Sequence, residues 1–176
     1  MKPKFNLRKK KGLSAVITTL LLVSLALILV GIVWAMVTNL VRTQIKSASC
    51  VDVTGKVSIN NKYTCYNSTS HELQFSISMG DISVDSILVE VTSQGNSANF
   101  ELPNASATVA NVVMYPSMLT NVKAPNKNSG SAYLFNVTAA GLTEAPDSIT
   151  VSPTLGTTQC GATDQLNQID DCTLLA

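Results

Sequence analysis

The pattern of hydrophobic and polar positions divides the chain into two parts. From Leu13 to Val41 no residue is charged, and nearly every position is apolar or small. This run exceeds the ~20 apolar residues that cross a bilayer as a helix, and in lipid a helix satisfies its own backbone polar groups. We therefore expect a transmembrane or core helix in the segment 13–49. Extended to residue 46, it would be ~50 Å long.

Beyond Cys50 the pattern acquires a period of two. Apolar and polar residues alternate at 73–79 and again at 87–91, and the shift of phase between these runs predicts a turn. The other candidate strands are 62–66, 98–102, 109–115, 131–138 and 148–152. Clusters of Asn, Ser, Gly and Pro separate the runs, which is turn chemistry. The expected fold class is α+β, with a mainly antiparallel β-sandwich head over residues 50–176.

Charge is distributed unevenly along the chain. Six of the 12 basic residues precede residue 13 without any acidic residue, whereas the rest of the chain carries the other six and all 11 acidic residues. A basic cluster beside an apolar helix, followed by an acidic remainder, argues against a nucleic-acid-binding protein. Because positive flanks stay in the cytoplasm, we expect a single-pass orientation with everything after Arg42 outside.

The start of the apolar run contains a candidate processing site. A secretory signal peptide has an apolar region of about 7–15 residues followed by a small-residue cleavage site, and this run is too long and lacks such a site. Instead, Lys9-Lys10-Lys11 is followed by Gly12 at the apolar boundary. A glycine there lets the backbone extend into a protease cleft. The alternative is that the basic flank only orients the helix.

The junction KKKG and the following LSAVITTLLLVSLALILVGIVWAMV resemble the class III signal segment of archaeal type IV pilins and archaellins. The resemblance covers residues 8–41. It implies that a membrane aspartyl peptidase removes the basic leader 1–12 by cleaving between Gly12 and Leu13. It also implies that the mature helix forms a filament core with a sandwich head outside.

The first residues of the expected mature helix support the archaeal form of this resemblance. Ser14-Ala15-Val16-Ile17 is similar to the S-P-V-I start of many archaeal pilins, with Ala15 in place of Pro. Bacterial pilins carry Glu at the position of Ile17. The bacterial assembly contact between that carboxylate and a neighbour's amine is therefore not expected here.

A line of small residues follows one side of the expected helix. Its members recur at spacings of seven, four and three, and are Ser24, Gly31, Ala35 and Thr38. Small side chains let helices approach closely, and hydroxyl groups can bond across the contact. We interpret this line as a helix-packing surface. The alternative is a chance scatter of small residues, since no GxxxG pair is present.

The four cysteines form two close pairs in sequence, Cys50 with Cys65 and Cys160 with Cys172. An even number in an external domain predicts two disulfides, with three connectivities open. We favour the local pairing, in which each bond closes a short loop and contributes ~3 kcal/mol in the chain-entropy model. The spacings do not match those of zinc sites, so we expect no metal there.

Three Asn-x-Ser/Thr sequons lie in the expected external part, at Asn67, Asn104 and Asn136. Each can accept an N-glycan on an external surface. A chain rich in Ser, Thr and Asn also generates this motif by chance. We favour Asn67 because it lies in a clear turn, whereas Asn136 lies in an expected strand that hinders access.

The sequence offers little for catalysis. His71, the single histidine, lies beside Glu72 at an expected strand start, where a solvated turn residue is a simpler interpretation than a general base. No Ser-His-Asp spacing, nucleophile elbow or phosphate loop is evident. Asp164, Asp170 and Asp171 do not follow the calcium-loop pattern, so we interpret them as a solvated acidic loop. We expect no enzyme, cofactor or metal.

These features predict a structural subunit of an archaeal pilus- or archaellum-like surface filament, held in the membrane by its helix before assembly. The resemblance implies copies of the chain or related pilins, a prepilin peptidase and an assembly machinery as partners. One alternative is a monomeric membrane-anchored adhesin or minor pilin that binds a partner through its head. A second is an ectoenzyme, which hydrolytic activity of residues 50–176 would favour.

Overall fold

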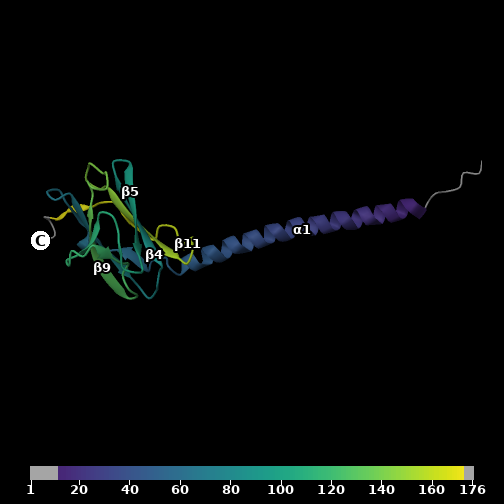
Figure 1. Ribbon diagram of the computed structural model, residues 1–176, viewed down its shortest axis with the longest axis horizontal. Coiled ribbons are helices and arrows are strands. Elements are labelled where there is room, and N and C mark those ends of the chain that lie inside the picture. Colours follow the sequence, from purple (N-terminus) through teal and green to yellow (C-terminus); the bar gives the residue numbers. More distant parts are fainter. Residues whose placement is uncertain (1–11, 173–176) are drawn as a thin grey trace, which may run out of the picture. The chain divides into compact units, whose positions relative to one another are not determined.

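The chain forms one long helix followed by a β-rich unit (Figure 1). The computed structural model describes residues 12–172, including the side chains of 16–41 and 50–172. The chain divides into two compact units, Met1–Ile45 and Lys46–Ala176. The α+β class expected from the sequence is confirmed.

The helix α1 (Gly12–Val51) is 40 residues long and runs beyond its expected end near residue 46. It contains no proline, and Leu and Ala, which are frequent in it, favour helix. At its C-terminal end the Thr54 hydroxyl donates to the Cys50 carbonyl oxygen at 3.2 Å, and the Val53 amide donates to the same oxygen at 3.3 Å. These bonds satisfy an otherwise orphaned carbonyl and close the last turn.

Strands from both ends of the β-rich unit build the first sheet. Its central order is β13-β2-β3-β9-β7, and β1 also pairs with β3. The strands are β1 (Val57–Ile59), β2 (Cys65–Asn67), β3 (Glu72–Met79), β7 (Val112–Tyr115), β9 (Ser129–Asn136) and β13 (Asp170–Asp171). A short 3-10 helix, η1 (Asn61–Tyr63), connects β1 to β2.

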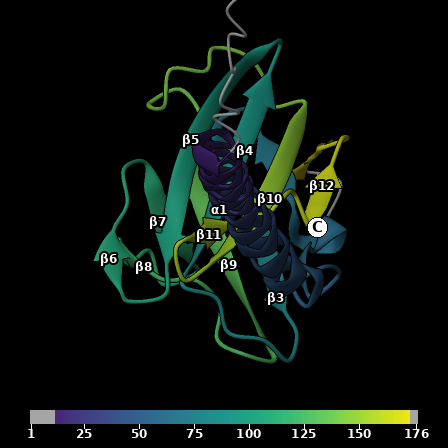
Figure 2. The same ribbon diagram turned by 90° about the vertical axis from the view of Figure 1, so that its right-hand side faces the viewer.

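The second sheet has the order β11-β10-β4-β5, and β12 pairs with β10 (Figure 2). Its strands are β4 (Ser86–Ser93), β5 (Asn96–Pro103), β10 (Ser148–Leu155), β11 (Thr158–Gln159) and β12 (Asp164–Leu166). A separate two-stranded ribbon contains β6 (Ala107–Thr108) and β8 (Asn121–Val122). Among the described strands, the pairs are antiparallel except for β13 with β2, which is parallel.

The long strands follow the alternation seen in the sequence. In β3 every second residue is buried, and these are Leu73, Phe75, Ile77 and Met79. β3 pairs with β9 over its whole length, and β4 pairs with β5 in the same way. Alternation therefore predicts which face of each long strand turns inward.

Aromatic rings connect the two sheets in a common core. Phe100 of the second sheet stacks on Phe135 of the first with 4.8 Å between ring centroids, and its centroid lies 5.9 Å from that of Phe75. Phe75 in turn stacks on Tyr133 at 5.1 Å. The buried hydrophobic cluster includes residues of both sheets, so neither sheet has its own separate core.

Candidate functional site

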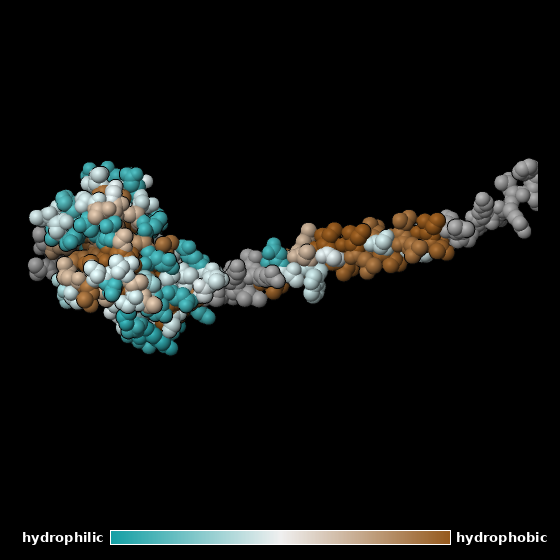
Figure 3. All heavy atoms as spheres, in the orientation of Figure 1, coloured by the Kyte–Doolittle hydropathy of each residue, from teal (hydrophilic) through white to brown (hydrophobic). Residues whose placement is uncertain are grey.

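The apolar part of α1 is the largest exposed hydrophobic surface that the structure describes. Val16–Val41 is a stretch of 26 residues with a mean hydropathy of 2.9, and none of them is buried. Figure 3 shows this stretch as a nearly continuous hydrophobic surface, whereas the visible face of the β-rich unit is mostly hydrophilic. Its large side chains include Trp34, which is 71% exposed. Such a surface requires lipid or protein around it.

The length of this stretch fits a membrane. At 1.5 Å per residue it covers about 39 Å, more than the ~30 Å hydrocarbon core of a bilayer. A helix of this length and composition, together with disulfides in the following unit, fits a membrane-anchored protein that faces an oxidising exterior.

The line of small residues lies within this exposed stretch. The Ser24 hydroxyl donates to the Leu21 carbonyl at 2.9 Å, and the Thr38 hydroxyl donates to the carbonyl oxygens of Trp34 and Ala35 at 3.0 and 3.1 Å. A Cβ added at Gly31 would meet no described atom within 4 Å. The hydroxyl groups are thus satisfied within the helix, and the line leaves space for a close neighbour.

The expected cleavage position lies at the start of α1. Gly12 is the first residue of the helix and Leu13 the second. The leader residues 1–11, with their basic side chains, lie outside the described part of the chain.

All four cysteines form disulfides, but the local pairing favoured from the sequence is wrong. Cys50 pairs with Cys160, with 5.4 Å between the Cα atoms, and Cys65 pairs with Cys172, with 4.9 Å between them. The two bonds span 110 and 107 residues of sequence. Each joins one end of the β-rich unit to the other.

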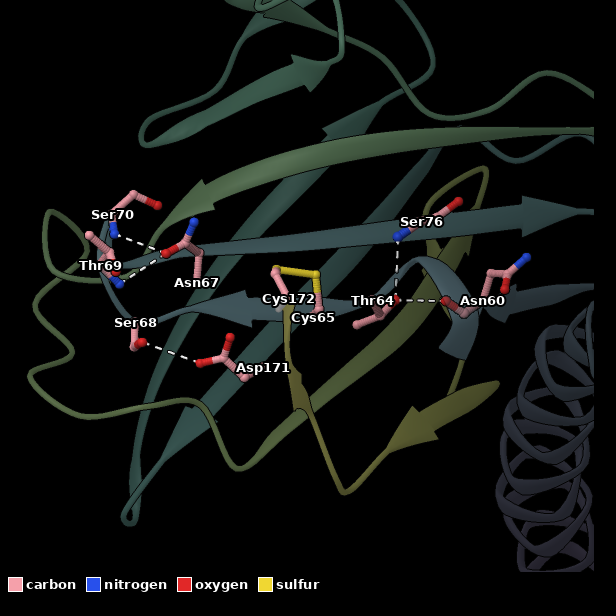
Figure 4. Close-up of a disulfide and its surroundings, with 10 residues drawn as sticks. All are labelled: Asn60, Thr64, Cys65, Asn67, Ser68, Thr69, Ser70, Ser76, Asp171 and Cys172. Carbon is pink, nitrogen blue, oxygen red and sulfur yellow. Dashed lines mark hydrogen bonds between the residues drawn. A yellow bond between two sulfur atoms is a disulfide. The ribbon is translucent and has the colours of Figure 1, made fainter. Parts of the chain in front are cut away.

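Strand pairing explains why closeness in sequence gave the wrong connectivity. β13 lies beside β2, where Asp170 is the register partner of Cys65, so Cys172 follows directly at that edge (Figure 4). Cys160 follows β11 and its amide donates to the Pro153 carbonyl at 2.9 Å, which fixes its position on the second sheet. Contacts between residues far apart in sequence therefore bring the partners within bonding distance.

Two of the three sequons lie on exposed turns. Asn67 ends β2, and its Oδ1 accepts from the amides of Thr69 and Ser70 at 2.9 and 3.2 Å (Figure 4). These bonds make an Asx-type turn. The side-chain amide nitrogen of Asn67, which would carry a glycan, points away from them (Figure 4). Asn104 follows β5 and is exposed, with its backbone amide bonded to the Asp85 carbonyl at 2.9 Å.

Asn136 has a more restricted setting. It is the last residue of β9 and is half-buried, and the next residue, Val137, is fully buried. Its Oδ1 accepts from the Thr138 hydroxyl and the Ala139 amide at 3.0 and 2.9 Å. The sequon is thus folded into a tight turn against the core.

Three of the candidate catalytic and calcium residues, His71, Asp164 and Asp171, have hydrogen-bond partners. His71 Nδ1 lies 3.1 Å from the Tyr66 hydroxyl. Asp164 Oδ2 accepts from the Ile59 amide at 2.8 Å, and Asp171 Oδ2 accepts from the Ser68 hydroxyl at 3.2 Å. In the described part of the chain, no group of three or more His, Cys, Asp or Glu residues is placed to hold a metal ion.

Three ionisable groups of the β-rich unit have shifted pKa values. Burial raises the pKa of the Tyr133 phenol, whose hydroxyl donates to the Lys123 carbonyl at 2.6 Å. Burial, and then the negative charge of Glu144, raises the pKa of Tyr66. At the surface, the hydrogen bond and charge of Lys127, 2.6 Å from Asp81 Oδ1, lower the pKa of that carboxyl.

The segment from Cys160 to Cys172 has a role that the sequence did not reveal. Both disulfides end on it, β12 pairs with the second sheet, and β13 pairs with the first. Its strands contain only two or three residues, so no alternation marks them. Two cysteines at its ends are the one signal that the sequence offers.

Comparison with known proteins adds no relative. No protein-family model, no curated protein and no solved structure matches the chain.

Proposed function

We propose that the protein is a structural subunit of an archaeal pilus- or archaellum-like surface filament that assembles through α1. The observation that carries this proposal is the exposed apolar stretch Val16–Val41, of which no residue is buried. A helix that only needed lipid would require ~20 such residues. This one is longer and is joined to a folded, disulfide-linked head, as a subunit that exchanges lipid for neighbouring helices needs to be.

We propose that the head is a β-sandwich. The two sheets share one hydrophobic cluster, and Phe100 of β5 stacks on Phe135 of β9 across it. Aromatic contacts between the inner faces of two sheets are typical of sandwich cores. Such a head would remain folded in water while the helix stays in lipid or in a filament core.

The proposed assembly has a simple energetic course. The bilayer first stores the subunit by α1. Cleavage after Gly12 then removes six basic residues, which are costly to move through lipid. The helix finally exchanges lipid for other helices, with Ser24, Gly31, Ala35 and Thr38 at the closest contact. Head-to-tail contacts that do not close on themselves produce a helical filament.

The second candidate is a monomeric membrane-anchored adhesin or minor pilin. The same exposed stretch supports it, because a helix that remains in lipid also exposes its apolar side chains when lipid is absent. The two candidates differ in processing. A plain anchor has no need to lose its leader, whereas a filament subunit does.

The test is electron microscopy of sheared surface filaments, with N-terminal sequencing of their subunit. We expect filaments whose subunit begins Leu-Ser-Ala-Val, and we expect Gly12→Val to leave unprocessed protein in the membrane. Ala15→Val, in the same segment but away from the cleaved bond, is the matched control and should be processed. A mature chain that begins at Met1 and remains in the membrane would refute the filament proposal and favour the anchor.

A further inference from the structure

The two disulfides connect the same two short segments of the β-rich unit. One segment runs from Cys50, in the last turn of α1, to Cys65 in β2, and the other runs from Cys160 to Cys172. The start of the first segment is bonded to the start of the second, and the end to the end. Together they form a closed loop of covalent bonds, which we call the covalent ring.

The two arms of the covalent ring also contact each other between the disulfides. The Ile59 amide of β1 donates to Asp164 Oδ2 of β12 at 2.8 Å. Farther along, β13 pairs with β2 next to the second disulfide (Figure 4). Cys65 and Cys160 are 3% and 5% exposed, so at least one sulfur of each bond is shielded from thiols in solution.

Without the covalent ring, short strand pairings would hold both ends of the head, since β13 pairs with β2 through two residues only. The first strand after the helix, β1, pairs with β3 through three residues only. A force that enters through α1 would first peel this strand away, and then the strands that follow. A pairing of three residues offers few backbone hydrogen bonds to resist such a force.

We propose that the covalent ring is a force bypass, which carries tension from α1 around the two sheets. Between Cys50 and Cys172 the shortest covalent path runs through the Cys50–Cys160 bond and the 160–172 arm. The chain from residue 66 to residue 159, which contains the long strands, lies outside this path. Tension between the helix and the C-terminal segment is shared by the two arms, and the long strands bear none.

The bypass predicts how far the head can be stretched. The 160–172 arm has a contour length of about 40 Å, whereas the ~122 residues from Cys50 to Cys172 would extend to about 400–440 Å. Either bond alone preserves a short path, because the 50–65 arm, at ~50 Å, is nearly as short. The covalent ring lies within a single chain, so it would serve a filament subunit and a monomeric anchor equally.

The experiment is to pull single full-length chains in detergent between peptide tags at their two ends, with and without a reductant. Unravelling of α1 adds the same contour length to the oxidised and to the reduced chain, so it does not affect the difference between them. We expect the reduced chain to gain about 360–400 Å more contour length than the oxidised chain. The double variants Cys50→Ser/Cys160→Ser and Cys65→Ser/Cys172→Ser should each remain short when oxidised.

Other results would overturn the proposal. An oxidised wild-type head that gains about 310–340 Å would have Cys50–Cys65 and Cys160–Cys172 bonds instead, with the long strands in the path of the force. A gain of about 400 Å by either oxidised double variant would show that its remaining bond does not carry the load. The reduced wild type provides the contour length of a head without disulfides. A variant with all four cysteines replaced by serine, which could fail to fold, is therefore not needed.

Discussion

Tyr133 is a residue whose single polar atom lies deep in the core. Its ring is fully buried between the sheets, while its hydroxyl reaches the Lys123 carbonyl ten residues earlier. The sequence predicted the strand but gave no sign of this bond. A buried hydroxyl must find a partner, and the partner is in a loop whose path depends on the whole fold.

We expect Tyr133→Phe to lower the free energy of unfolding at pH 7 by about 1–2 kcal/mol, because the Lys123 carbonyl loses its donor. At alkaline pH, by contrast, the variant should lose less of its free energy of unfolding than the wild type. The folded state raises the pKa of this phenol above its unfolded value of 10.0, so the wild type loses stability as the pH rises above 10. The variant, which has no phenol there, should lose less over this range.

Urea unfolding of the full chain in detergent, followed by near-UV circular dichroism at pH 7 and pH 10.5, measures both effects. Tyr63→Phe is the control, because Tyr63 is 59% exposed and should leave the free energy of unfolding unchanged at pH 7. Equal alkaline losses in the wild type and Tyr133→Phe would contradict the assignment.

The three sequons make a second prediction at the scale of residues. When the protein is produced in its native host cells, we expect glycans on Asn67 and Asn104 and none on Asn136. The first two side chains are exposed, whereas Asn136 is half-buried and is followed by fully buried Val137. Glycopeptide mass spectrometry, with Asn67→Gln as the reference for an empty site, measures occupancy. A modified Asn136 would show that the sequon is glycosylated before it folds.

At the scale of elements, the sequence predicted what is long and periodic. The apolar run became α1, and the alternating runs at 73–79 and 87–91 became β3 and β4. Strands of two or three residues, such as β1 and β13, were not predicted, because so short a stretch has no measurable period. In the run 62–66 only the last residues form a strand, since η1 occupies its start.

The cysteine pairing failed for a related reason. It depends on β13 lying parallel to β2, a contact between opposite ends of the unit. Nothing in the local sequence of either strand records its partner. The identity of the disulfide residues was therefore predictable, but their connectivity was not.

Helix packing supplies the prediction for α1. Gly31→Leu should yield subunits that are processed but fail to assemble, because a leucine at the closest point of the small-residue line pushes helices apart. Ala26→Leu is the matched control, since it lies on the opposite side of the helix and adds similar bulk. Filament yield by electron microscopy and processing by N-terminal sequencing distinguish the outcomes. Equal yields from both variants would remove the line from the proposed contact.

At the scale of the whole molecule, charge and apolar surface are separated along the chain. The stretch Val16–Val41 contains no ionic side chain, so a filament held by it has no ion pair to screen. We expect the stability of the filament to change little between about 0.05 and about 1 M salt. Over this range the Debye length falls from about 14 Å to about 3 Å, so interactions between exposed charges would be strongly screened. Detergents that replace neighbouring helices should dissolve it. Sedimentation of filaments across both series tests this, and dissolution by salt alone would point to contacts between heads.

The disulfide connectivity also has a consequence for biosynthesis. Cys50 and Cys65 leave the ribosome long before their partners, because 110 and 107 residues of chain separate the members of each pair. Until Cys160 and Cys172 arrive, the only bond open to the early cysteines is the wrong one with each other. An early bridge of that kind would have to be exchanged by a thiol before the head is complete. Correct oxidation therefore reports that nearly the whole head has been synthesised.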